Sequence, residues 1–240
     1  METAAPAAER GIDPKPWGIP AIAAVLAIPV ALFAVSFLVD APEDLTTGEI
    51  VVGLVSTLVF KDALFIGLVA AFALWRYRLG WQGLGLRPFD RSLWWLPVVA
   101  AAAALVSVIV YSAILVGLGF DQPEQREVQT FFESNAALPL AGFALVIMAP
   151  LSEEIFFRGF IFPGLIRPLG LAGAMAATGI LFGAFHITGS DTVALVLPFS
   201  LIGALFCWLY YRTGSLWPSI ITHFLFNSVG FVAGAIGAQS

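Results

Sequence analysis

The chain has 240 residues, of which 60% are apolar and only 11% carry a charge. Ordinary soluble domains carry a charge on about 25% of their residues, so this composition excludes a typical soluble protein and indicates one embedded in a membrane. The net charge of −5 comes from 16 acidic and 11 basic residues that form no basic stripe, which argues against nucleic acid as a partner. The lipid bilayer is therefore the first predicted partner.

Apolar runs long enough to span a bilayer follow one another along the chain. A spanning helix needs about 20 mostly apolar residues, and each run is bounded by charges, glycine or proline. The runs cover residues 17–39, 50–75, 94–120, 136–162, 171–187, 193–211 and 216–236. We therefore predict an all-α fold, a polytopic transmembrane bundle of about seven spanning helices. It would form a single domain over residues 17–240.

Two polar stretches lie outside these runs. Residues 1–16 are rich in alanine, proline and charge, which predicts a disordered tail. Residues 121–135 are polar but contain Val128, Phe131 and Phe132, a spacing that could place one apolar edge of a short helix on the membrane surface. A plain loop fits the same residues equally well.

The distribution of lysine and arginine between the loops predicts the orientation of the chain, because these residues are retained on the cytoplasmic side. One set of loops and the N-terminal segment contain Arg10, Lys15, Arg76, Arg78, Arg87, Arg91, Arg167 and Arg212. The opposite loops are acidic, and Arg126 is their only cation. We expect the N-terminus in the cytoplasm and the C-terminus outside.

A few ionisable or amide side chains interrupt the apolar runs. Such groups cost several kcal/mol inside hydrocarbon, so they tend to face a cavity and to serve a function. In chain order they are Lys61, Asp62, Glu153, Glu154, Arg158, His186, His223 and Asn227. The only two histidines of the chain are both in this set.

Charged residues in the second and fourth runs allow more than one interpretation. Residues four apart on a helix share a face, so Glu154 can pair with Arg158. Glu153 lies about 100° round the helix and is free to point elsewhere, although all three residues could also form one structural ion network. Lys61 and Asp62 are adjacent, so each needs its own partner, and we interpret them as structural.

The fifth and seventh runs repeat the four-residue spacing. Phe182 precedes His186 by four residues, and His223 precedes Asn227 by four. A lone histidine near a helix end is usually a packing residue. Two histidines, a free glutamate and an asparagine on faces that can turn inward favour a functional site.

The ordered motifs resemble those of the CAAX-protease and bacteriocin-processing family, which includes the type II CAAX prenyl protease. The motifs are Glu153-Glu154-x-x-x-Arg158, Phe182-x-x-x-His186 and His223-x-x-x-Asn227, within a resemblance that covers residues 136–230. The run Gly214-Ser215-Leu216-Trp217-Pro218 is also similar to bacterial members. The resemblance implies an intramembrane endopeptidase in the plasma membrane of a prokaryote. Its substrate would be a peptide or a membrane-associated protein.

The resemblance also implies roles for the motif residues, without a metal or another cofactor. Glu153 and His186 would activate water, while His223 and Asn227 would stabilise the oxyanion. The motif residues Glu154, Arg158 and Phe182 would support them, the first two by orienting the first carboxylate.

Two alternatives stay open. Glu153, His186 and His223 form a possible zinc ligand set with an open position for water, although the chain lacks His-Glu-x-x-His. The same bundle could also be a non-catalytic membrane scaffold or immunity protein. The presence of all motif residues argues against that interpretation.

Depth along the predicted helices presents a difficulty. At about 1.5 Å per residue, the runs as drawn place Glu153, His223 and His186 at depths that differ by on the order of 15 Å. Convergence requires the fourth helix to extend past Arg158, or the fifth helix to begin later.

Two glycine pairs predict close approach of helices. Gly179/Gly183 and Gly230/Gly234 have the small-residue spacing that lets membrane helices pack tightly. We expect packing within the chain, and the sequence leaves the oligomeric state open.

Overall fold

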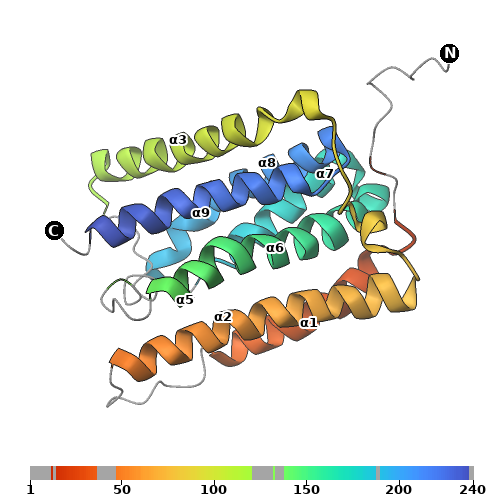
Figure 1. Ribbon diagram of the computed structural model, residues 1–240, viewed down its shortest axis with the longest axis horizontal. Coiled ribbons are helices and arrows are strands. Elements are labelled where there is room, and N and C mark those ends of the chain that lie inside the picture. The colour runs from red at the N-terminus through yellow and green to blue at the C-terminus, as the bar shows by residue number, and fades with distance from the viewer. Residues whose placement is uncertain are drawn as a thin grey trace.

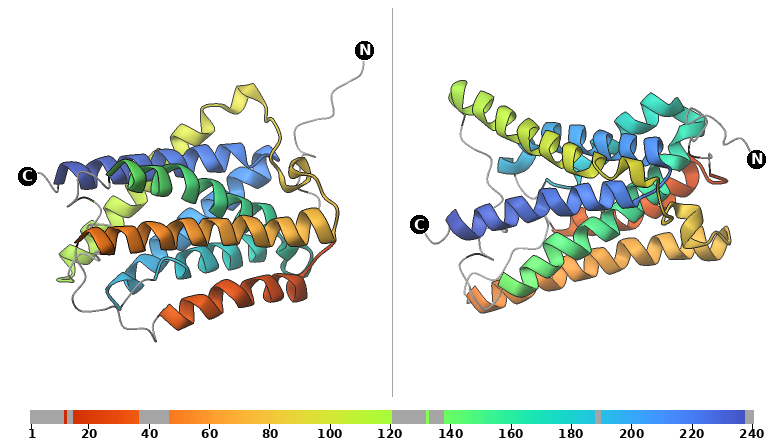
Figure 2. Two further views of the ribbon diagram at one scale, coloured as in Figure 1. Left: turned by 60° about the horizontal axis from the view of Figure 1, so that its bottom comes forward. Right: turned by 45° about the horizontal axis from the view of Figure 1, so that its top comes forward.

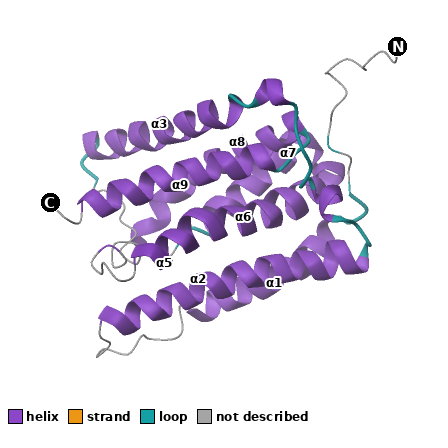
Figure 3. Cartoon of the chain, in the orientation of Figure 1, coloured by secondary structure: helices purple, strands orange, loops and turns teal. Residues whose placement is uncertain are grey.

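The computed structural model describes residues 12, 15–36, 47–120, 132, 138–187 and 190–237. Over these residues the chain contains helices and loops but no strand (Figure 3). The long helices lie roughly side by side in one bundle (Figures 1 and 2). The predicted all-α class is therefore confirmed.

The first half of the chain supplies three long helices. Their bounds are Ile19–Ser36 for α1, Thr47–Val69 for α2 and Leu96–Gly117 for α3. A π-helical segment, η2 (Ala70–Arg76), extends α2, and the short 3₁₀ segments η3 (Trp81–Leu84) and η4 (Arg91–Leu93) lead into α3.

The second half begins with a helical stretch in which α- and π-helical segments alternate. The segments are α5 (Leu138–Gly142), η5 (Phe143–Met148), α6 (Ala149–Glu153), η6 (Glu154–Ile161) and α7 (Phe162–Ala184). The stretch is followed by η7 (Ser190–Leu195), α8 (Val196–Thr213) and α9 (Trp217–Gly237). Two of the motifs lie in the first stretch or at its end, and the third lies in α9.

Five helical stretches among the described residues are long and apolar enough to cross a membrane. They are Val51–Arg76, Arg91–Gly117, Leu138–Ala184, Thr192–Thr213 and Trp217–Gly237, and Ile19–Leu32 is a shorter apolar helix. The predicted count of seven spanning helices is therefore not confirmed. The difference arises because the predicted runs 136–162 and 171–187 belong to one stretch of 47 residues, and because the first run yields a shorter apolar helix.

A break at Gly170 divides this long stretch. Its φ of 69° and ψ of 174° are not helical, and glycine adopts such a positive φ readily because it lacks a Cβ. Before the break α6 and η6 contact α2, whereas α7 packs mainly against α8. The helix that carries Glu153 thus extends well past Arg158, as convergence of the motifs required. Glu153 and His186 are nearly equidistant from Gly170 along the chain.

Glycine permits the close packing of α7 against α8. A Cβ on Gly179 or Gly183 would collide with the backbone of α8, so the predicted close approach is confirmed for this pair. In the other pair, Gly234 packs against Phe132, while the Cβ position of Gly230 has no neighbour within 4 Å among the described residues.

Aromatic contacts position the first two helices against η6. The indole nitrogen of Trp17 donates to the carbonyl of Phe160 at 2.9 Å, and the two rings stack with centroids 5.0 Å apart. Phe65 of α2 stacks on Phe156 with centroids 4.1 Å apart. These contacts fix α2 beside the segment that carries the first motif.

Two predictions concern residues that lie largely outside those described. The disordered tail was predicted over residues 1–16, and the short surface helix or loop over residues 121–135. Only a few residues of either segment are described, so both stay predictions.

Candidate active site

Glu154 and Arg158 form the fully buried centre of the candidate site. Nη1 of Arg158 donates to Oε1 of Glu154 at 2.9 Å, and neither side chain has exposed surface. Nη2 donates to the carbonyl of Gly203 at 2.9 Å. The guanidinium also lies over the rings of Phe182 and Phe206, 4.4 and 5.1 Å from their centroids, in cation–π geometry. The pair expected from the four-residue spacing is present, and each charge compensates the other.

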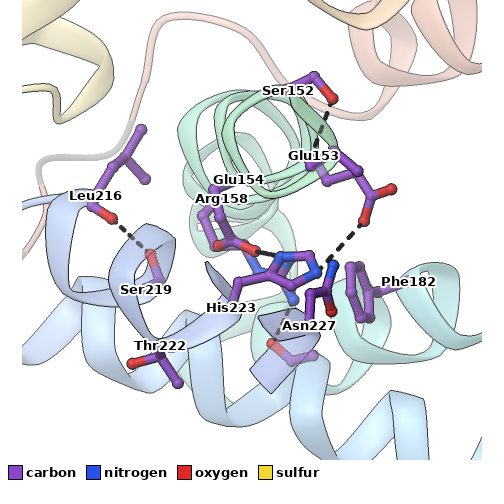
Figure 4. A network of polar contacts seen from close by, with 12 residues as sticks. Ser152, Glu153, Glu154, Arg158, Phe182, Leu216, Ser219, Thr222, His223 and Asn227 are labelled. Carbon is purple, nitrogen blue, oxygen red and sulfur yellow. Dashed lines mark hydrogen bonds and ion pairs between the residues drawn. The ribbon is translucent and has the colours of Figure 1, made fainter. Parts of the chain in front are cut away.

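His223 lies between the two glutamates of the first motif (Figure 4). Its Nδ1 is 3.1 Å from Oε1 of Glu154, and its Nε2 is 4.0 Å from Oε2 of Glu153. An ionised carboxylate only accepts hydrogen bonds, so Nδ1 carries a proton in this contact and Nε2 is directed toward Glu153. The resemblance implied that Glu154 and Arg158 orient Glu153. In the structure Glu154 contacts the ring of His223, and that ring faces Glu153.

Glu153 has a partner of its own on α2. Nζ of Lys61 lies 2.5 Å from Oε1 of Glu153 and 3.4 Å from Oδ1 of Asp62. The hydroxyl of Ser152 donates to Oδ1 of Asp62 at 2.6 Å, and Asp62 is fully buried. The sequence assigned Lys61 and Asp62 no role in the site and did not single out Ser152. Charged residues are unusual in apolar runs, and both the second and the fourth run contain them. This shared feature could have suggested that the two runs contact each other through these residues.

His186 follows the end of α7 and is half-buried. Its Nδ1 is 2.7 Å from the carbonyl of Phe182, which accepts, so this nitrogen is the donor. The ring lies between those of Phe182 and Phe199, with centroids 4.7 and 4.4 Å away. The ring of Phe182 also contacts that of His223, with centroids 5.8 Å apart. In the neutral ring of His186, Nε2 is left as an acceptor.

Asn227 satisfies a backbone carbonyl that the helix leaves without a partner. The N–H of Ala149 bonds to Ala144 in the π-helical pattern, and Pro150 has no N–H. The carbonyl of Leu145 therefore has no donor from its own helix, and the amide nitrogen of Asn227 donates to it at 2.8 Å. An amide nitrogen carries two hydrogens, so one hydrogen is left for another acceptor.

The zinc alternative finds no assembled ligand set. Among the described residues, no group of three or more His, Cys, Asp or Glu side chains is arranged to hold a metal ion. Nδ1 of His223 is directed at Glu154, and Nδ1 of His186 at a backbone carbonyl. In both rings Nε2 is thus the nitrogen that a metal would have to use.

Residues 135–229 match the sequence model of the family described as type II CAAX prenyl endopeptidase Rce1-like. The matched segment contains all three motifs. The resemblance to the CAAX-protease family that those motifs indicated is therefore confirmed. A Bacillus subtilis protein named "Putative membrane peptidase YdiL" is 30% identical over 105 residues, which are 44% of this chain and 41% of that protein. The match thus spans less than half the length of this curated relative. No solved structure matches the chain.

Proposed function

We propose that this chain, whose residues 135–229 match the Rce1-like CAAX endopeptidase family, is an intramembrane endopeptidase. It hydrolyses a peptide bond in a membrane-associated protein or peptide. The observation that carries the proposal is the approach of the first and third motifs, in which His223 lies 3.1 Å from one glutamate and 4.0 Å from the other. A buried carboxylate and histidine facing each other are the parts that such chemistry needs.

Hydrolysis of a peptide bond requires a base for water, donors for the oxyanion and an acid for the leaving amine. In this proposal Glu153 and His186 activate the water. The distance of 4.0 Å between Oε2 of Glu153 and Nε2 of His223 exceeds a hydrogen bond, so the two atoms are free to contact the water and the substrate beside them. His223 takes up a proton at Nε2 from solvent before the reaction, and this N–H donates to the oxyanion, with the free amide hydrogen of Asn227 as the second donor. The proton taken from water then passes to the leaving nitrogen.

The proposed orientation in the membrane rests on the charges of the loops. The excess of arginine and lysine in one set of loops supports a cytoplasmic N-terminus and an external C-terminus, as the positive-inside rule expects. The partners are then the bilayer and a peptide or membrane-protein substrate, in the plasma membrane of a prokaryote. No cofactor is part of the proposal.

The proposal is tested by reconstituting the purified protein in liposomes with a library of membrane-anchored peptides and identifying new termini by mass spectrometry. Wild-type protein should generate such termini, and the rate should be unchanged by 1,10-phenanthroline because the site acts without a metal. A known zinc protease serves as the positive control for the chelator. If the chelator silences the wild type and added zinc restores it, Glu153, His186 and His223 become metal ligands.

Replacing Asn227 with alanine should give a slow but measurable enzyme. Loss of one oxyanion donor costs about 10²–10³-fold in kcat, and the unpaired Leu145 carbonyl should cost about 1–3 kcal/mol of stability. Both kcat and the melting temperature in detergent should therefore fall. Ser228→Ala, at the next position of α9, is the matched control and should change neither. A wild-type kcat in Asn227→Ala would remove Asn227 from the chemistry.

A further inference from the structure

We propose that Lys61 is a positioning residue for the reaction, because it keeps the carboxylate of Glu153 ionised and turns one of its oxygens toward His223. This inference rests on the proposed function of Glu153. Lys61 lies in α2, outside residues 135–229 that match the family, and it belongs to none of the three motifs.

The two oxygens of Glu153 face different partners. Oε1 contacts Nζ of Lys61 at 2.5 Å, and Oε2 lies 4.0 Å from Nε2 of His223. Only 9% of the Glu153 side chain is exposed, and a carboxylate this deeply buried takes up a proton unless a positive charge lies beside it. A protonated Glu153 would not be a base, so its role depends on a nearby cation.

The charge balance of the cluster assigns that task to Lys61. Among the described residues, the cluster consists of the charged side chains that are linked by ion pairs around Glu153 and Glu154. They are Lys61, Asp62, Glu153, Glu154 and Arg158. They are three carboxylates and two cations, so the cluster carries one net negative charge when both histidines are neutral. Arg158 is fully buried against Glu154 and the carbonyl of Gly203. Lys61 is thus the cation among the described residues that contacts Glu153.

The ammonium of Lys61 is itself held in place. Asp62 lies 3.4 Å from Nζ and is fixed by the hydroxyl of Ser152. The ring of Phe65, one turn along α2, lies 5.9 Å from Nζ and stacks on Phe156. Of the two carboxylates beside Nζ, that of Glu153 makes the shorter contact.

The kinetic test compares two variants of Lys61. Lys61→Met removes the charge at similar length, and we expect kcat to fall by about 10–100-fold, part of the roughly 10²–10⁴-fold that a general base contributes. KM should change little. Lys61→Arg keeps the charge and should restore most of kcat. Phe60→Leu, an exposed position next to Lys61 on α2, is the control for disturbance of the helix. A wild-type kcat in Lys61→Met, or an equal loss in Lys61→Arg, overturns the proposal.

A second measurement does not depend on activity. Dicyclohexylcarbodiimide adds to protonated carboxylic acids in apolar surroundings, with no leaving group, and the adduct is located by mass spectrometry. Glu153 of the wild type should resist labelling at neutral pH, and labelling should rise several-fold in Lys61→Met but not in Lys61→Arg. Glu153→Gln gives the background.

The labelling separates failure of this inference from failure of the proposed function. If no variant cleaves any peptide but Lys61→Met alone labels at Glu153, Lys61 still holds the carboxylate ionised and only the endopeptidase proposal fails. Ready labelling of Glu153 in the wild type would overturn the inference. This outcome is measured on the wild-type protein, so it does not depend on the folding of any variant.

Discussion

Glu153→Gln is expected to lower the rate of cleavage by about 10⁴-fold, the upper end of the contribution of a general base, and so to abolish detectable turnover. Glutamine has nearly the same shape as glutamate but cannot accept a proton from water at neutral pH. Its amide oxygen can still accept from Lys61, so the contact between α2 and α6 is retained. The melting temperature should therefore stay close to that of the wild type.

The measurement is turnover of a cleaved peptide in detergent and in liposomes, together with the melting temperature. Glu49→Gln provides the matched control, because Glu49 is exposed in the first turn of α2 and far from the motifs in the sequence. It should behave as the wild type in both measurements. Turnover at the wild-type rate by Glu153→Gln would remove this residue from the role of base.

The features that the sequence predicted correctly depend on contacts between near neighbours in the chain. Glu154 and Arg158 are four apart on one helical face, and their ion pair follows from that spacing alone. Gly179 and Gly183 likewise lie on one face of α7, and their lack of a Cβ permits the approach of α8. The all-helical class followed from the length of the apolar runs.

The features that the sequence did not predict depend on segments far apart in the chain. Lys61 and Glu153 are separated by 92 positions, and Asn227 and Leu145 by 82. No periodicity specifies which face of α2 meets which face of α6. The π-helical pattern of η5 also changes which backbone carbonyls lack a donor. The hydrogen bond from Asn227 to the carbonyl of Leu145 therefore could not be predicted without the backbone structure.

The number of spanning helices shows a related limit. Hydropathy locates apolar residues but does not say where a helix stops. The two predicted runs are continuous in one stretch of 47 residues, which is broken only at Gly170, where the backbone is not helical.

Arg158→Ala is expected to lower both stability and activity. Arg158 is fully buried and compensates the equally buried carboxylate of Glu154. Removing one member of a buried pair leaves an uncompensated charge and costs about 3–5 kcal/mol. Glu154 also holds Nδ1 of His223 at 3.1 Å, so a change in its protonation or position should release the ring and reduce turnover.

A double variant separates the structural contribution of Arg158 from its effect on the reaction. Arg158→Met combined with Glu154→Gln removes both charges, and it should recover part of the lost melting temperature because no buried charge is left unpaired. Activity should not recover, since His223 no longer faces a carboxylate at Nδ1. Arg167→Ala, at an exposed position of α7, is the control and should change neither property. A loss of activity in Arg158→Ala at an unchanged melting temperature would instead require the guanidinium to act directly on the substrate.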